Sequence, residues 1–391
     1  MARMCITGCL AVLDGKNGLM SQIPKCMIIP SGKEKNGRKL KIANGGIMMK
    51  MKTITTVAVA GMMVFSLTAC GSGAGTEKTG DASGNQTAES GAAAETIDLS
   101  VAYADAENSV FAKGADAFAE KLSELSGGTM TCTMYPNGTL GSISEVAAMI
   151  QQGTCDVSPI VTSSLVDFCP ELGLFDLPFL FTDYDDARTT IEGEIGTYFS
   201  EQLASAGMHV GSWLTMGFRE TTSSKPISTV ADFKGLKIRV QSNEVHQAIF
   251  NALGAAPTVI NFSELYTAME QGTVDAQENP YVNIASNAYF EVQDYLVETN
   301  HVFQFAAMLV SDETYNSLTD EQKGWVDEAA AYAADVEWQA TREDNEAAKQ
   351  TCIDAGMTLV ELDHDELLAA TQSVYDTYET QYGSLLDVMG K

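Results

Sequence analysis

Basic side chains are scarce in most of this chain. The first 69 residues hold ten of the 23 Lys and Arg but only two of the 52 Asp and Glu. The remaining residues therefore carry 13 basic and 50 acidic side chains, a net charge of −37 against −29 for the whole chain. A surface of that sign repels phosphate backbones and anionic lipid headgroups, so no nucleic-acid partner is expected.

Motifs for metals, phosphates and nucleophilic catalysis are also missing. The four His are widely separated, and there is no His-Glu-x-x-His, Gly-x-Ser-x-Gly or Gly-Lys-Ser segment. Four cysteines follow residue 96 without forming a Cys-x-x-Cys pair, which argues against a zinc ribbon or a dithiol redox site. We expect no cofactor and no metal. Buried free thiols are the preferred interpretation, and a disulfide stays open as the alternative, for Cys132, Cys155, Cys169 and Cys352.

The apolar stretch from Ile54 to Leu67 is too short to cross a bilayer, which needs roughly 20 residues. A basic head at residues 50–52 precedes it, and Leu-Thr-Ala-Cys at residues 67–70 ends it. A basic head, an apolar core and small residues before a cleavage point are typical of a secretory signal. Because the Leu-Thr-Ala-Cys segment ends on Cys, we expect a lipoprotein with lipid on Cys70. Such a protein is located outside the cytoplasm and anchored to the membrane.

Several segments precede the folded part of the chain. Residues 1–47 fit neither a signal nor a domain, and we expect a mis-called start, which N-terminal sequencing of the precursor tests. Residues 48–69 are the expected signal peptide. Residues 70–96, rich in Gly, Ala, Ser and Thr, are the expected flexible tether. Residues 97–391 are long enough for a two-lobed domain.

Strand-like and helix-like patterns alternate along this domain, which predicts an α/β architecture. Residues 97–101 alternate apolar and polar side chains, and residues 111–125 place apolar side chains on one helical face before Gly127-Gly128. Expected strands cover residues 97–101, 130–135, 157–161, 209–213, 236–240 and 305–310, and a long helix covers about 319–355, followed by a C-terminal helix.

An internal repeat predicts two similar lobes. Ser144-Glu145-Val146 followed by Gln152-Gly153-Thr154-Cys155-Asp156 recurs 119 residues later as Ser263-Glu264-Leu265 and Gln271-Gly272-Thr273-Val274-Asp275. In each copy we expect Ser to cap a two-turn helix, Gly to end it and Asp to begin the next strand. The expected lobes cover about residues 97–215 with a later returning segment, and about residues 216–310.

Five of the 13 basic side chains after residue 69 gather between residues 219 and 239. Arg239 lies in an apolar strand, which should hold its guanidinium on a rigid element. Such a planar fork suits a carboxylate, which accepts two parallel hydrogen bonds. An internal salt bridge explains the residue equally well from composition alone.

The chain resembles the extracytoplasmic solute receptors of TRAP (tripartite ATP-independent periplasmic) transporters over about residues 97–383. The matching segments, in the family's order and spacing, are Asp176–Phe181, Met216–Ser223, Ala231–Val240, Leu253–Thr258, Phe262–Tyr266 and Val274–Pro280. The resemblance implies a two-lobed periplasmic-binding-protein-like fold with a hinge, a long crossing helix and a central ligand cleft. It also implies a monomeric receptor, not an enzyme, that closes on a carboxylated solute and delivers it to TRAP membrane subunits.

The resemblance further assigns ligand contacts. Arg239 matches the arginine that grips the carboxylate, Arg219 a second arginine, Asn279 a hydrogen-bonding asparagine and Phe262 the aromatic residue against the ligand. Further candidate polar contacts, for which an ordinary loop or surface role is the alternative, are Tyr103, Asp105, Ser163, Ser164 and Ser242.

Departures from the family pattern narrow the ligand. Where members that bind sialic acid carry a polar amide and charged residues, this chain has Ala104, Val161 and Ser164. Sialic acid is therefore disfavoured, and a sugar acid such as a uronate or aldonate, or a C4-dicarboxylate, fits better. Small polar side chains in the first lobe favour the sugar acid. The alternative function is an extracytoplasmic lipoprotein enzyme acting on a carboxylated sugar, since a carboxylate pair assembled in the cleft is not excluded by one sequence.

Overall fold

The computed structural model of the protein describes residues 96–391. The structure does not describe residues 1–47, the expected signal peptide at residues 48–69, Cys70 or the tether up to residue 95. Within residues 96–391, no helix is both long and apolar enough to cross a membrane. The four cysteines of this part are free thiols, three of them buried and Cys132 half-buried, as the preferred interpretation predicted.

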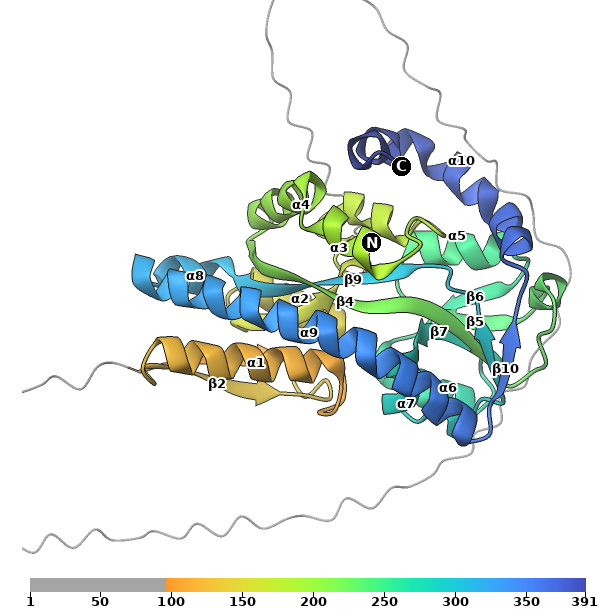
Figure 1. Cartoon of the computed structure of the whole chain (residues 1–391), viewed down its shortest axis with the longest axis horizontal. Helices are drawn as coiled ribbons and strands as arrows, with labels where there is room; N and C mark the ends of the chain where they lie inside the picture. The colour runs from red at the N-terminus through yellow and green to blue at the C-terminus, as the bar shows by residue number, and fades with distance from the viewer. Residues whose placement is uncertain (1–95) are drawn as a thin grey trace, which may run out of the picture. The chain divides into compact units, whose positions relative to one another are not determined.

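Strands and helices alternate as the sequence predicts (Figure 1). The strands are β1 (Ile97–Ala102), β2 (Met130–Tyr135), β3 (Val157–Val161), β4 (Met208–Ser223), β5 (Lys237–Val240), β6 (Ala256–Val259), β7 (Ala276–Pro280), β8 (Tyr295–Glu298), β9 (Phe303–Ser311) and β10 (Thr358–Glu361). The α-helices are α1 (Val110–Leu125), α2 (Ile143–Gln151), α3 (Tyr184–Ile191), α4 (Glu194–Ser205), α5 (Glu244–Ala252), α6 (Leu265–Glu270), α7 (Tyr281–Ser286), α8 (Asp312–Ser317), α9 (Asp320–Asp354) and α10 (His364–Met389).

Two groups of strands share the long strand β4. In the first sheet, β1 pairs in parallel with β2 and β3, while β9 pairs antiparallel with β3 and with β4 from Met208 to Phe218. In the second sheet, β4 from Arg219 onward pairs antiparallel with β7 and β8, and β5 pairs in parallel with β6 and β7. A single strand therefore connects the two sheets, and its register changes from one partner to the other at Phe218 and Arg219.

Strand β9 lies in the first sheet. The sequence boundary at residue 310 assigned it to the second lobe, but every residue of β9 is buried between β3 and β4. The apolar side chains from Phe305 to Val310 are buried on both faces of the sheet, as in a central strand, while β3 and β4 pair with the backbone at the two edges. Strand β9 thus returns the chain to the first sheet after the second.

The internal repeat corresponds to equivalent positions in the two sheets. Gly153 and Gly272 follow α2 and α6 with φ of 71° and 65°, the left-handed conformation that ends a helix. Asp156 and Asp275 then directly precede β3 and β7. Each carboxylate accepts a backbone N–H from a strand of the same sheet, 2.8 Å from Ser100 N and 3.2 Å from Lys237 N respectively.

The helix caps of the repeat differ from the prediction. Ser142, not Ser144, caps α2, because Ser142 and Glu145 form a reciprocal capping box and the helix starts earlier. Ser263 caps nothing, because it lies within a 3-10 turn, Phe262–Glu264, that leads directly into α6. The glycine and aspartate parts of the repeat are therefore structural equivalents, whereas its serines are not.

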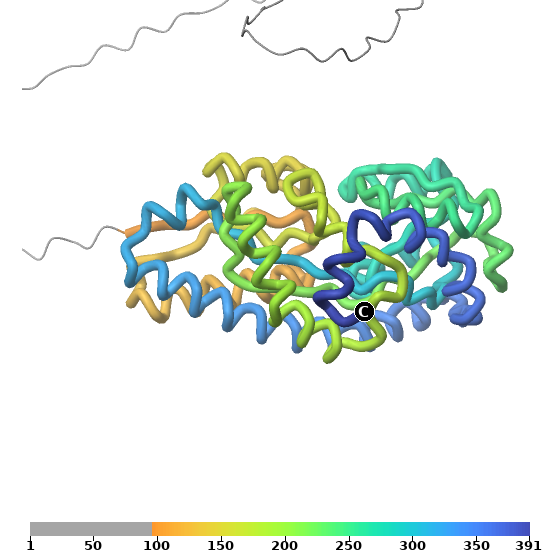
Figure 2. The backbone as a smooth tube through the Cα atoms, turned by 90° about the horizontal axis from the view of Figure 1, so that it is seen from above, coloured from red at the N-terminus to blue at the C-terminus, as the bar shows by residue number. Residues whose placement is uncertain are grey.

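The long helix α9 crosses both sheets (Figures 1 and 2). It packs on α1 and β4 and reaches α7 beside the second sheet. Small buried residues at Ala329, Ala330 and Ala333 allow the close approach to its neighbours. The expected crossing helix is confirmed, and with β4 it joins the two halves of the molecule.

Candidate functional site

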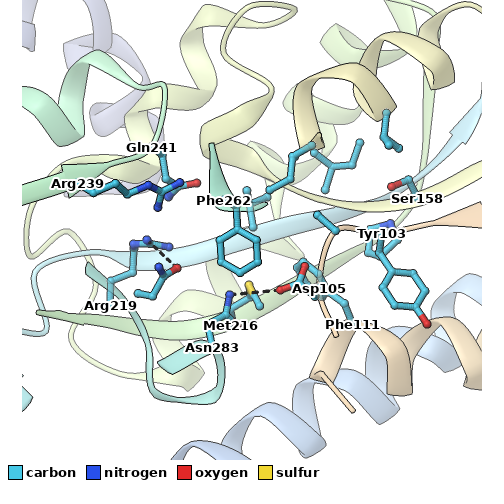
Figure 3. A pocket seen from close by; sticks show the side chains of 17 residues that line it. Tyr103, Asp105, Phe111, Ser158, Met216, Arg219, Arg239, Gln241, Phe262 and Asn283 are labelled. Carbon is cyan, nitrogen blue, oxygen red and sulfur yellow. Dashed lines mark hydrogen bonds between the residues drawn. The ribbon is translucent and has the colours of Figure 1, made fainter. Parts of the chain in front are cut away.

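A pocket lies at the junction of the two sheets and holds about 520 Å³ of empty space, its mouth included (Figure 3). The first half contributes the segment after β1 together with α2 and β3, and the second contributes β4, β5, β7 and α7. The lining residues are Tyr103, Ala104, Asp105, Phe111, Ile143, Val146, Ser158, Pro159, Ile160, Val161, Met216, Arg219, Arg239, Gln241, Phe262, Asn279 and Asn283.

Arg239 presents an unpaired cation to this pocket. It lies on β5, its side chain is 3 % exposed, and its Nε donates to the carbonyl of Ile260 at 2.8 Å. Its Nη1 is buried without any hydrogen-bond partner, and the side chain makes no ion pair within the described residues. Burial lowers the pKa of Arg239 to about 10, so the guanidinium remains charged at neutral pH. An anionic ligand is the partner that such a group lacks.

Arg219 makes the internal ion pair that composition alone allowed for Arg239. Its Nε pairs with Glu278, and its Nη2 lies 3.0 Å from Glu278 Oε1 and 3.1 Å from Asn279 Oδ1. Its Nη1 donates to Gln304 Oε1 at 2.9 Å. Arg219 lines the pocket, but most of its donors hold the wall together rather than facing an empty space.

Asn279 connects this ion pair to the pocket surface. Its Oδ1 accepts from Arg219, and its Nδ2 donates to Gln277 Oε1 at 2.6 Å, which leaves one N–H of the amide for a ligand. Asn279 and Arg239 lie on neighbouring strands β7 and β5. The structure therefore brings together the arginine and the asparagine that the sequence singled out.

Phe262 supplies an apolar wall. The half-buried ring lies between the arginines and the first-half residues in Figure 3, with Met216 beneath it. An apolar ring beside two buried guanidiniums excludes water, and a lower local dielectric strengthens any contact between Arg239 and an anion.

A buried hydrogen-bonded cluster supports the arginines from behind. His246 on α5 lies 3.1 Å from Asp176 and 3.5 Å from Glu278. Burial lowers the pKa of His246, but Glu278 and Asp176 raise it, to about 9. Burial also acts to raise the pKa of Glu278, but Arg219 and His246 hold it well below its usual range. The cluster is therefore a set of fixed opposite charges.

Two of the candidate polar contacts from the first half line the pocket in different ways. Asp105 is 6 % exposed and accepts a hydrogen bond from Asn283 Nδ2 at 3.3 Å. Burial raises the pKa of Asp105 to about 6. The Tyr103 ring turns away from Phe262, so its hydroxyl lies far from the arginines (Figure 3). Asp105 is the candidate that faces the ligand space.

The three serines lie elsewhere. Ser164 and Ser242 line an adjoining hollow, about 540 Å³ with its open mouth included, that shares Arg239 and Phe262 with the main pocket. Ser163 lines neither hollow, because its hydroxyl donates to Asp176 at 2.6 Å in the buried cluster. Its structural role is to position the carboxylate that faces His246.

Gln241 and Asn283 are lining residues that the sequence did not single out. Gln241 follows β5 and donates to Gln304 Oε1 at 3.1 Å, and Asn283 lies in α7. Gln241 stands two residues after Arg239, a spacing that keeps both side chains on one face of an extended strand, so the sequence does indicate it. The sequence does not indicate Asn283, because its position depends on the turn from β7 into α7.

Two sheets joined by one strand and one long helix, with an unpaired arginine in the pocket between them, define a two-lobed solute-binding protein. Residues 101–384 match the family of bacterial extracellular solute-binding proteins, family 7. The chain belongs to this family, whose members are binding proteins of transporters rather than enzymes.

Individual relatives agree with this assignment. The chain is 32 % identical over 271 residues to the C4-dicarboxylate-binding periplasmic protein DctP of Rhodobacter capsulatus, covering 68 % of this chain and 80 % of that protein. A TRAP periplasmic solute-binding protein from Polaromonas, solved with D-erythronate, is 31 % identical with a TM-score of 0.72, covering 74 % of this chain and 96 % of the other. One from Shewanella oneidensis, solved with succinate, is 27 % identical with a TM-score of 0.73, covering 75 % and 97 %.

Proposed function

We propose that the protein is the receptor of a TRAP transporter and captures a small carboxylic acid at Arg239. The observation that carries this proposal is that Arg239 lines the pocket and that its buried Nη1 has no hydrogen-bond partner among the described residues. A ligand carboxylate accepts from it, with Asn279 donating a further hydrogen bond and Phe262 covering the pair. Relatives solved with D-erythronate and succinate support the ligand class, a sugar acid such as a uronate or aldonate, or a C4-dicarboxylate.

Ligand-induced stabilisation without turnover tests the receptor function. The purified mature protein is melted with D-galacturonate, D-galactonate, D-erythronate and succinate, and each acid is then recovered and analysed by mass spectrometry. We expect at least one acid to raise the melting temperature and to return unchanged. Conversion of the acid would instead support the alternative of an enzyme acting on a carboxylated sugar. Stabilisation by none of the acids would contradict the proposal.

We also propose that the receptor is located outside the cytoplasm and anchored to the membrane by a lipid. The family assignment places the chain outside the cytoplasm. Lipid on Cys70 then anchors it beside the TRAP membrane subunits to which a monomer delivers its ligand. The basic head, the apolar stretch and the Leu-Thr-Ala-Cys box support this anchor. A Cys70→Ala variant should leave the membrane fraction, and its retention there at the parental level would refute lipidation.

A further inference from the structure

The unpaired polar groups of the pocket differ between its two ends. At one end, Arg239 Nη1 is a buried donor without an acceptor. Away from Arg239, Asn283 Oδ1 is a buried acceptor without a donor, and among the described side chains the Asp105 carboxylate hydrogen-bonds only to the Asn283 amide. Figure 3 places Arg239 on one side of the Phe262 ring and Asp105 on the other, with Asn283 below the ring. The pocket therefore offers donors at one end and acceptors at the other.

Asp105 is an anion without a cation. It is 6 % exposed and forms no ion pair within residues 96–391. Burial raises the pKa of Asp105 to about 6, with Asn283 opposing that shift, so the carboxylate is mostly ionised at neutral pH. A buried charge of this kind is costly unless donors surround it, and the pocket itself supplies one amide. Hydroxyl groups of a ligand can supply further donors.

The chemistry of the far end of the ligand follows from these groups. A hydroxyl can donate to Asp105 or to Asn283 Oδ1, whereas an ionised carboxylate has no proton to donate. A second ligand carboxylate would also meet the charge of Asp105 in a site of low dielectric, where like charges repel strongly.

We propose that Asp105 and Asn283 form a hydroxyl-recognition site that selects acids with one carboxylate and a hydroxylated far end over dicarboxylates. The ligand class is then the sugar acid, and the C4-dicarboxylate is rejected by charge. This inference rests on the proposed function, because it takes the carboxylate site at Arg239 as given.

Two pairs of acids test the selection by titration calorimetry at about pH 7.5. D-galactonate and galactarate differ only at the sixth carbon, which is a hydroxymethyl group in one and a carboxylate in the other. D-erythronate and succinate form a shorter pair with four carbons each. In at least one pair we expect the parent protein to bind the monocarboxylate at least tenfold more tightly than the dicarboxylate. A parent protein that binds the dicarboxylates equally well or better, or that binds neither pair, overturns the proposal.

Variants then assign the selection to the pair. Asp105→Asn keeps the shape of the side chain and removes its charge. The ratio of the affinity for the monocarboxylate to that for the dicarboxylate should then fall at least tenfold. Asn283→Ala should weaken the monocarboxylate at least tenfold and leave the dicarboxylate unchanged, and provides a second readout if Asp105→Asn does not fold. Glu107→Gln removes an exposed charge two residues away and should preserve the parental ratio. A parental ratio in the folded Asp105→Asn or Asn283→Ala protein contradicts the proposal.

The Arg239→Lys variant distinguishes a failure of this inference from a failure of the proposed function. Arg239→Lys should weaken both members of a pair alike. If Arg239→Lys binds as the parent does, the carboxylate grip fails whatever the ratio. If Arg239→Lys loses binding while the parent does not discriminate between the two acids, only the role of Asp105 and Asn283 fails.

Discussion

At the scale of single residues, the two arginines have similar surroundings but different functions. Both are almost fully buried and line the same pocket, yet Arg219 is held by Glu278 while Arg239 keeps a donor without a partner. The resemblance to TRAP receptors predicts Arg239 as the grip, whereas its place in an apolar strand alone allows an internal salt bridge equally well. The sequence cannot predict the pairing of Arg219 with Glu278, because 59 residues separate them and only the register of β4 against β7 brings them together.

Glu220, the neighbour of Arg219, gives a prediction on pH. Burial raises the pKa of Glu220 to about 8, although backbone N–H groups of Thr299 and Asn300 oppose the shift. The folded state therefore keeps a proton that the unfolded chain releases above about pH 4.3. The free energy of unfolding should fall as pH rises from about 4.5 to 8, on the order of a few kcal/mol from this group.

Urea denaturation of the parent and of Glu220→Gln at about pH 5 and pH 8 measures this effect. The decrease should be smaller in Glu220→Gln, because an amide does not ionise. Glu379→Gln, an exposed change on α10, should reproduce the parental decrease. If Glu220→Gln loses as much stability as the parent over this range, Glu220 is not the titrating group.

At the scale of elements, β4 differs most from the sequence prediction. A strand was expected over residues 209–213, but β4 runs from Met208 to Ser223. Its second half has Arg219, Glu220, Thr221 and Thr222 buried in succession, so it shows no apolar alternation. Those polar residues are satisfied by distant partners, which a local pattern does not reveal. By contrast, β2 and β3 have the predicted bounds, because their neighbours in sequence are turns and helices with clear signals.

Gly217 allows β4 to pass from one sheet to the other. It has φ of 83° at a register shift in the pairing with β9, and a Cβ there would overlap the Tyr184 hydroxyl and come within 2.9 Å of Asn345 Nδ2. Gly217→Ala should therefore lower the free energy of unfolding by about 2 kcal/mol or more, from backbone strain and overlap together. Thermal or urea denaturation measures the loss.

Gly235→Ala is the matched control for Gly217→Ala. Gly235 also has a positive φ, 76°, but no atom lies within 4 Å of a Cβ placed there. It should lose about 1 kcal/mol from strain alone. Equal losses in the two variants would show that the packing around Gly217 imposes no constraint on β4.

At the scale of the whole molecule, the pocket takes residues from both halves. Asp105 follows β1 in the first sheet, Arg239 belongs to the second, and β4 and α9 join the two halves. The α/β class, the crossing helix and the location of a pocket between lobes followed from alternation, repeat and resemblance. The sequence analysis named six of the lining residues as candidate contacts: Tyr103, Asp105, Arg219, Arg239, Phe262 and Asn279. The other lining residues were not predicted as contacts, because their identity depends on how segments from the two halves meet.

A ligand that contacts both halves should favour a closed arrangement, since its affinity then differs between open and closed states. Small-angle X-ray scattering of the mature protein, with and without a saturating acid, measures this change. We expect a smaller radius of gyration with the acid, and no change when Arg239→Ala is mixed with the same acid. An unchanged radius in the ligand-saturated parent would contradict hinge closure.

The most direct test of the central claim is titration calorimetry of Arg239→Lys beside the parent protein, with the acid that stabilises the parent most. Hydrogen bonds to a charged group contribute about 1.5–3 kcal/mol each, so losing the two of the guanidinium fork should cost about 3 kcal/mol or more. That loss weakens binding about a hundredfold, at about 1.4 kcal/mol per factor of ten, although the lysine keeps the positive charge. Near-parental affinity in a folded Arg239→Lys protein would mean that Arg239 does not grip the carboxylate, and the account of this pocket would be wrong.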